Sequence, residues 1–256
     1  LGQNFLTEAS GLDKVIEAAE IKPEDQVLEI GPGLGSLSYL IAQKAASLIA
    51  VEIDAALIPP LQKALSPFSN HRIIHGDILK QDLSLLNLQE GYLVVANIPY
   101  YISSAIIRHL LTAAQKPRRI VLTVQKEVAQ RVCAKDGKQS LLSLSVKVFG
   151  EPSLAGLIPA GAFLPAPDVD SAVLRIDLFP QPIVPVEDLD RFFKLAKAGF
   201  SQKRKTLKNA LGSGLAVGNE NAEKLLKAAG IDPQRRAETL GLDEWAGLVE
   251  AEKAQA

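Results

Sequence analysis

The sequence predicts an α/β fold: a mostly parallel sheet with helices on both faces, followed by a small all-helical domain. Short apolar runs that resemble buried strands alternate with segments whose apolar residues recur at helical spacing. The proline-rich stretch 179–185 is a natural linker, and the chain beyond it contains helical patterns but no strand candidate. We therefore expect one domain over residues 1–180 and a helical domain over residues 186–256.

Seven short segments are strand candidates because they are apolar and are bounded by glycine or polar residues. They are 26–30, 47–54, 71–77, 92–97, 118–125, 153–158 and 172–178. The last two are expected to form a hairpin pair around a long loop. Because strands and helices alternate along this part of the chain, the pattern predicts a doubly wound, mostly parallel, seven-stranded sheet.

Helical periodicity marks the segments between these strands and the whole of the C-terminal part. The candidates are 8–20, 36–46, 55–66, 103–114, 126–135, 139–147, 187–200, 203–211, 220–229 and 243–253. Pro59 and Pro60 allow only a short or kinked helix in the third of these, because proline lacks the amide hydrogen of a helix interior.

The composition is that of an ordinary globular protein, with 47% hydrophobic and 22% charged residues. No apolar run reaches the roughly 20 residues that span a bilayer, and no secretory signal is visible. Cys133 is the only cysteine and the three histidines are scattered, so we expect neither a disulfide nor a metal site. We expect a cytoplasmic monomer without membrane partners. The chain begins at Leu1 and contains no methionine, so we also expect natural residues before Leu1.

A glycine turn and two acidic residues follow the first three strand candidates. Gly31-Pro32-Gly33-Leu34-Gly35 lies where the first strand meets the first helix, and glycines there allow a sharp turn and close approach of a ligand. Glu52, about 20 residues on, is placed to accept hydrogen bonds from ribose hydroxyls. Asp77 is placed to meet an adenine amino group. The spacing Gly-x-Gly-x-Gly, with Ser36 next, differs from a dinucleotide fingerprint. It resembles the cofactor loop of class I (Rossmann-like) methyltransferases, which bind S-adenosylmethionine.

The turn Asn97-Ile98-Pro99-Tyr100 follows the fourth strand candidate and indicates adenine chemistry. The exocyclic amine of adenine is a poor nucleophile, because its lone pair is delocalised into the ring. The Asn97 side-chain carbonyl and the Ile98 backbone carbonyl can hold its hydrogens and turn the lone pair toward a methyl group. Pro99 fixes the turn, and Tyr100 offers a face on which an extruded base can stack.

A basic stripe opens the C-terminal part. Between Arg191 and Lys208 there are seven basic residues and no acidic one, on a chain of net charge −1. Lys203, Arg204, Lys205 and Lys208 are expected on adjacent turns of one helix, where they would bind RNA phosphates. A weaker basic patch is expected at Lys116, Arg118 and Arg119.

Eight motifs in order resemble the small-subunit (16S) ribosomal RNA adenine dimethyltransferases of the KsgA type over nearly the whole chain. They are Leu1–Leu6, Glu29–Gly35, Glu52–Asp54, Gly76–Asp77, Asn97–Tyr100, Gln125–Ala129, Phe163–Val173 and Phe200–Leu207. The resemblance implies N6,N6-dimethylation of two adjacent adenines in a hairpin near the 3′ end of small-subunit ribosomal RNA, and a role in small-subunit biogenesis. The implied partner is that RNA or the precursor of the small-subunit particle.

The resemblance also implies roles for individual residues. Gln3 to Leu6 would lie over S-adenosylmethionine, and Phe163 would face the flipped adenine opposite Tyr100. Together with the turn above, the expected cofactor contacts are Asn4, Leu6, Gly31, Gly33, Glu52, Asp77 and Asn97, with S-adenosylhomocysteine as the product and no metal.

Two alternatives remain open at the level of the sequence. Sister enzymes methylate an adenine of large-subunit ribosomal RNA and confer macrolide resistance, and they share the glycine loop and the Asn-(Ile/Leu)-Pro-Tyr turn. The stretches Phe163–Val173 and Phe200–Leu207 fit the small-subunit group better. The other alternative is a noncatalytic ribosome-assembly factor, against which the intact turn at Asn97 argues.

Overall fold

The fold was analysed in a computed structural model that describes residues 3–134 and 138–255. Leu1 and Gly2, which belong to the first family motif, lie outside the described residues. Contacts between Cα atoms divide the chain into two compact units: residues 1–130 with 151–179, and residues 131–150 with 180–256.

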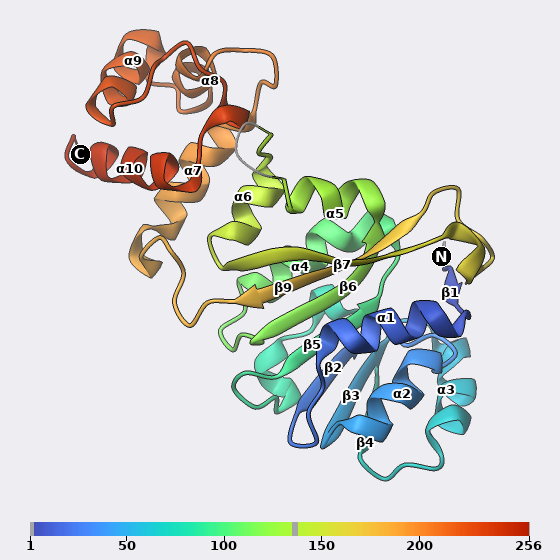
Figure 1. The fold of residues 1–256 in the computed structure, drawn as a ribbon. Helices are drawn as coiled ribbons and strands as arrows, with labels where there is room; N and C mark the ends of the chain where they lie inside the picture. Colours follow the sequence, from blue (N-terminus) through green and yellow to red (C-terminus); the bar gives the residue numbers. More distant parts are fainter. Residues whose placement is uncertain (1–2, 135–137, 256) are drawn as a thin grey trace. The chain divides into compact units, whose positions relative to one another are not determined.

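The first unit is built on a seven-stranded sheet, as the sequence predicts (Figure 1). The strand order is β4-β3-β2-β5-β6-β9-β7. The strands are β2 (Gln26–Ile30), β3 (Ser47–Glu52), β4 (His71–His75), β5 (Leu93–Asn97), β6 (Arg119–Gln125), β7 (Gly150–Ile158) and β9 (Ser171–Leu178). Strands β2 to β6 pair in parallel, and β9 is antiparallel to β6. The mostly parallel order and the adjacency of the last two strands confirm the prediction.

Helices cover both faces of this sheet (Figure 1). They are α1 (Ala9–Ala19), α2 (Ser36–Lys44), α3 (Ile58–Leu65), α4 (Ser103–Leu111) and α5 (Lys126–Val132). The first three bury their apolar sides, including Val15, Ile41 and Leu61, in one core with alternate residues of the strands. Pro59 and Pro60 lie in the first turn of α3, where the missing amide hydrogens cost nothing. The helix has 8 residues and is short, as expected.

The second unit contains α6 (Leu141–Lys147), α7 (Leu189–Phe200), α8 (Leu207–Gly214), α9 (Gly218–Ala228) and α10 (Leu242–Lys253). Its core includes Trp245, which is 0% exposed and whose ring stacks on Phe200 at 5.7 Å between centroids. The unit includes residues 131–150, which the expected division at 180–186 assigned to the first domain. Helix α6 packs on α7, and the Gln139 amide donates to the Glu238 carbonyl at 3.0 Å.

The predicted helix 203–211 is wrong at its start. Residues 201–205 form turns, and α8 begins only at Leu207. The Leu207 amide donates to the Arg235 carbonyl at 2.7 Å, and the Lys208 amide donates to the Pro233 carbonyl at 3.2 Å. A helix through residue 203 would have used these amides in its own ladder. Tertiary hydrogen bonds therefore move the start of the helix toward the C-terminus.

No helix in the described part of the chain is long and apolar enough to cross a membrane. Over residues 3–134 and 138–255, no group of three His, Cys, Asp or Glu side chains is placed to hold a metal ion.

Candidate functional site

A cavity of about 310 Å³ lies at the carboxyl ends of the parallel strands of the first unit. Gly31 follows β2, Glu52 ends β3, Asp77 follows β4 and Asn97 ends β5, and all four line the cavity. Strands β2 and β5 are neighbours in the sheet although two strands separate them in the sequence. This is the switch point at which open α/β sheets bind ligands.

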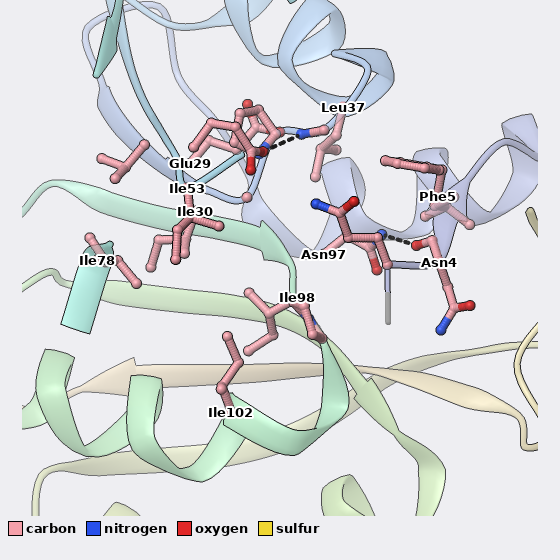
Figure 2. Close-up of a pocket in the computed structure, with 18 of the residues that line it drawn as sticks. Asn4, Phe5, Glu29, Ile30, Leu37, Ile53, Ile78, Asn97, Ile98 and Ile102 are labelled. Carbon is pink, nitrogen blue, oxygen red and sulfur yellow. Dashed lines mark hydrogen bonds between the residues drawn. The ribbon is translucent and has the colours of Figure 1, made fainter. Parts of the chain in front are cut away.

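The structure brings all the predicted cofactor and acceptor residues to this one cavity. They are Asn4, Leu6, Gly31, Gly33, Glu52, Asp77, Asn97, Ile98, Pro99, Tyr100 and Phe163. Figure 2 labels Asn4, Asn97 and Ile98 of this set and shows Asn4 facing Asn97. It also shows Ile53 and Ile78 on the opposite side of the cavity. Their individual roles stay predictions.

Glu52 holds the glycine loop in place. The residue is 1% exposed, and its carboxylate accepts the amide hydrogens of Gly33 at 3.0 Å and Asp54 at 2.9 Å. Gly31 and Gly33 have φ angles of +66° and +59°, a region that favours glycine. A Cβ on Gly33 would lie 2.9 Å from Cε1 of Phe5. The loop is therefore in close contact with the N-terminal segment.

Asp77 also makes local contacts at its strand end. Its carboxylate accepts the Leu79 amide hydrogen at 3.0 Å and lies 3.8 Å from the Lys80 ammonium. One carboxylate oxygen thus caps a short 3₁₀ helix, Ile78–Lys80. The turn fixes the carboxyl group at the wall of the cavity.

Glu29 also lines the cavity, although the sequence reasoning gave it no role. The side chain is 1% exposed, and its Oε2 has no hydrogen-bond partner among the described residues. Burial, with a smaller contribution from the charge of Glu52, raises the pKa of the Glu29 carboxyl to about 8. An acid as the penultimate residue of an otherwise apolar strand, directly before a glycine turn, is the signal that could have identified it.

The N-terminal segment is tied to Asn97 at the wall of the cavity. The Asn97 side-chain amide donates to the Asn4 carbonyl at 3.0 Å (Figure 2). Strand β1 (Phe5–Leu6) pairs antiparallel with β8 (Phe163–Leu164), and Leu6 lies opposite Phe163. The sequence does not predict this ribbon, because two-residue strands have no detectable periodicity.

The turn Asn97–Tyr100 is held by hydrogen bonds at both ends. Because the Asn97 amide nitrogen is occupied by Asn4, its Oδ1 is left to accept hydrogen bonds. The hydroxyl groups of Tyr100 and Ser171 share a hydrogen bond of 2.6 Å. Burial raises the pKa of the half-buried Tyr100, so this hydroxyl stays neutral at physiological pH. Phe163 is 4% exposed. The turn can present two acceptors and an aromatic ring to one amine.

Some residues of the basic stripe in the second unit form ion pairs with acids from other helices, and others do not. Arg191 pairs with Glu252, and Lys208 pairs with Glu223 at 3.2 Å. No acidic residue lies within the stripe itself, but acids from α9 and α10 balance these two basic residues. Lys203, Arg204 and Lys205 are exposed in the turn between α7 and α8. Their side chains have no ion-pair partner among the described residues.

Two residues of the weaker basic patch are also paired with acids. Arg118 binds Asp25 with both terminal nitrogens, each at 2.8 Å, and Arg119 pairs with Glu20 and Asp177. The positive charges of Arg118 and Arg119 are thus compensated by nearby carboxylates of the same unit.

Comparisons with known proteins agree with this geometry. The family model described as "Ribosomal RNA adenine dimethylase" matches residues 1–253. The "Ribosomal RNA small subunit methyltransferase A" of Dehalococcoides mccartyi (strain CBDB1) is 48% identical over 251 residues, covering 97% of this chain and 86% of that protein.

Two solved structures share the fold over nearly the full length. A dimethyladenosine transferase from Plasmodium falciparum superposes with a TM-score of 0.81 at 27% identity, covering 98% of both chains. The 23S rRNA methyltransferase ErmE superposes with a TM-score of 0.77 at 26% identity, covering 97% of this chain and 99% of the other. The match of the family model over residues 1–253, together with the relative at 48% identity, shows that this chain belongs to the ribosomal RNA adenine dimethylase family.

Proposed function

We propose that this protein transfers methyl groups from S-adenosylmethionine to the N6 amine of two adjacent adenines in a hairpin near the 3′ end of small-subunit ribosomal RNA. The products are N6,N6-dimethyladenine and S-adenosylhomocysteine. The observation that carries the proposal is the position of the Asn97–Tyr100 turn, which lines the same cavity as the glycine loop and the acidic strand ends. A methyl donor and an adenine can meet only where both sets of contacts share one space.

The cofactor side of the cavity fits a nucleoside. Glu52 uses one lone pair of each oxygen for backbone amides, so each oxygen can still accept a ribose hydroxyl. Asp77 is placed to accept from the adenine amino group. Leu34 and Ile53 line the same cavity and are 46% and 52% exposed, which gives the base an apolar surface. S-adenosylmethionine supplies an electrophilic methyl group on a sulfonium, and no metal is needed for this chemistry.

The acceptor side fits the amine of a flipped adenine. Asn97 Oδ1 and the Ile98 carbonyl would accept its two hydrogens and turn the nitrogen lone pair toward the methyl group. The ring of Tyr100, and Phe163 opposite it, would hold the base. The nitrogen gains a carbon and a positive charge, then loses a proton to water. No strong base is required, because the alkylated amine is acidic.

The RNA partner is supported by the helical unit and by the relatives. Lys203, Arg204 and Lys205 are exposed and have no ion-pair partner in the described part of the chain, so they offer a surface for phosphates. We propose residues 186–256 as the RNA-binding domain and residues 1–180 as the methyltransferase domain. Identity of 48% to a small-subunit methyltransferase favours that RNA over the large-subunit target in the name of the 26% identical ErmE. We expect a cytoplasmic monomer that acts on the RNA or on a precursor particle.

The test is methyl transfer in parallel to small-subunit RNA and particles, to large-subunit RNA and to duplex DNA, with mass spectrometry of the products. Two methyl groups on each of two adjacent adenines of small-subunit RNA are expected. Transfer only to large-subunit RNA or to DNA would overturn the proposal. Asn97→Ala should abolish transfer and leave RNA binding largely intact, whereas a noncatalytic assembly factor would show no transfer before the substitution either.

A further inference from the structure

Tyr101 combines two properties that no other aromatic residue of the cavity shares. It is 73% exposed, yet it lines the same cavity as Asn97 and Phe163. It lies in the 3₁₀ helix Tyr100–Ile102, directly after the acceptor turn. A side chain that lines a cavity while most of its surface meets solvent lies at the rim of that cavity.

The neighbouring aromatic residues are used within the fold, whereas Tyr101 is not. Tyr100 is half-buried and bonded to Ser171, and Phe163 is 4% exposed. Among the described residues, the Tyr101 side chain has no hydrogen-bond, ion-pair or ring partner. An exposed aromatic ring without a partner, at the mouth of a ligand cavity, is available to a ligand.

The strand that Tyr101 follows indicates which ligand it meets. Leu34 and Ile53 are the other large apolar residues that line the cavity and remain exposed, and they follow β2 and β3 on the cofactor side. Tyr101 follows β5, on the acceptor side. In the proposed reaction, its ring would therefore lie next to the part of the substrate that continues out of the cavity, which is the RNA strand on either side of the target adenine.

We propose that Tyr101 is a stacking platform for the base next to the adenine in the cavity, an inference that rests on the proposed function. A base that leaves the stack exposes the face of its neighbour. An aromatic side chain can restore that stacking for any base, at a low cost in side-chain entropy. Because the substrate is two adjacent adenines, the base on Tyr101 is, for one of the two transfers, the other target.

The test is a thermodynamic cycle between the protein and the RNA. Small-subunit RNA, naked and in assembling particles, carries an abasic nucleotide on the 5′ or the 3′ side of the target adenine. Tyr101→Leu removes the ring, and Tyr101→Phe keeps it. Leu85→Ala is the matched control, because Leu85 is also 73% exposed but does not line the cavity.

With intact RNA, Tyr101→Leu should raise the KM for RNA about tenfold, with kcat and the cofactor KM little changed. Tyr101→Phe and Leu85→Ala should behave as the unsubstituted protein. With the abasic nucleotide at one of the two positions, Tyr101→Leu should not raise the KM for RNA further, because the base that stacks on the ring is already missing.

Equal effects of Tyr101→Leu on intact RNA and on both abasic RNAs would overturn the inference and leave the proposed function standing. An unchanged KM in Tyr101→Leu would do the same. If the unsubstituted protein transfers no methyl group to small-subunit RNA in either form, the proposed function fails, and the inference fails with it.

Discussion

The hydroxyl groups of Tyr100 and Ser171 lie 2.6 Å apart and share a hydrogen bond. Ser171 is the first residue of β9 and is 0% exposed, so its position is fixed by the sheet. The orientation of the Tyr100 ring, which would stack on the target adenine, is thereby tied to the position of β9.

Removing either hydroxyl group should therefore slow methyl transfer to a similar extent. Ser171→Ala and Tyr100→Phe should each lower kcat/KM by roughly fivefold, the equivalent of a hydrogen bond of about 1 kcal/mol. The double variant should be no slower than either single one, which steady-state kinetics can measure. Additive losses would show that the two groups act independently.

Glu29 should make the stability of the ligand-free protein depend on pH. Its pKa is about 8 in the folded protein, against 4.5 for the ordinary carboxyl. Between these values the unfolded chain has lost a proton that the folded protein keeps, so the free energy of unfolding falls as pH rises. The loss approaches about 1.4 kcal/mol per pH unit between pH 5 and 8. Urea unfolding of the protein and of Glu29→Gln should show this slope only in the former.

The control for this measurement is Glu17→Gln, which removes an exposed carboxyl from α1. It should retain the pH slope of the unsubstituted protein. A slope that survives in Glu29→Gln would assign the pH dependence to another group.

Gly33 and Gly31 should respond differently to alanine, although both have positive φ angles. A Cβ at Gly33 would lie 2.9 Å from Phe5 Cε1, whereas the nearest atom to a Cβ at Gly31 is a backbone oxygen 3.9 Å away. Both variants carry a backbone strain of roughly 1 kcal/mol, but only Gly33→Ala must also displace Phe5. Calorimetry with S-adenosylmethionine should show the weaker binding in Gly33→Ala. In a Phe5→Ala background the two variants should converge, and a persistent difference would contradict the role given to Phe5.

The exposed turn at Lys203 and Lys205 should carry salt-dependent RNA affinity. The double reversal Lys203→Glu with Lys205→Glu should weaken RNA binding and flatten its dependence on salt, by a slope of roughly 0.7 to 0.9 per lost phosphate contact. Lys44→Glu with Lys63→Glu makes the same change of charge at exposed sites of α2 and α3 and should leave the slope nearly intact. Equal slopes for the two double variants would exclude the turn as an RNA contact.

The sheet and the cavity were predictable because both depend on local pattern. Strands with both faces buried appear in the sequence as apolar runs. In a parallel sheet the carboxyl ends of the strands lie at the same edge. The sequence alone therefore predicted that Gly31, Glu52, Asp77 and Asn97 lie close together. Long-range pairing was not predictable. The β1–β8 ribbon joins residues far apart in the sequence through only two residues on each side.

Charge balance and domain membership were not predictable for the same reason. The partners of Arg191 and Lys208 come from helices distant in the sequence. Residues 131–150 lie between strands of the first unit in the sequence, yet their contacts group them with the C-terminal helices. The composition along the chain indicates neither which residues form these ion pairs nor which unit residues 131–150 belong to.

The ribbon of β1 and β8 joins two parts of the cavity wall through one pair of short strands. Leu6 of β1 and Phe163 of β8 lie opposite each other, and both line the cavity. A displacement of β1 would therefore break the pairing that positions Phe163, so that a change at one part of the wall is transmitted to the other.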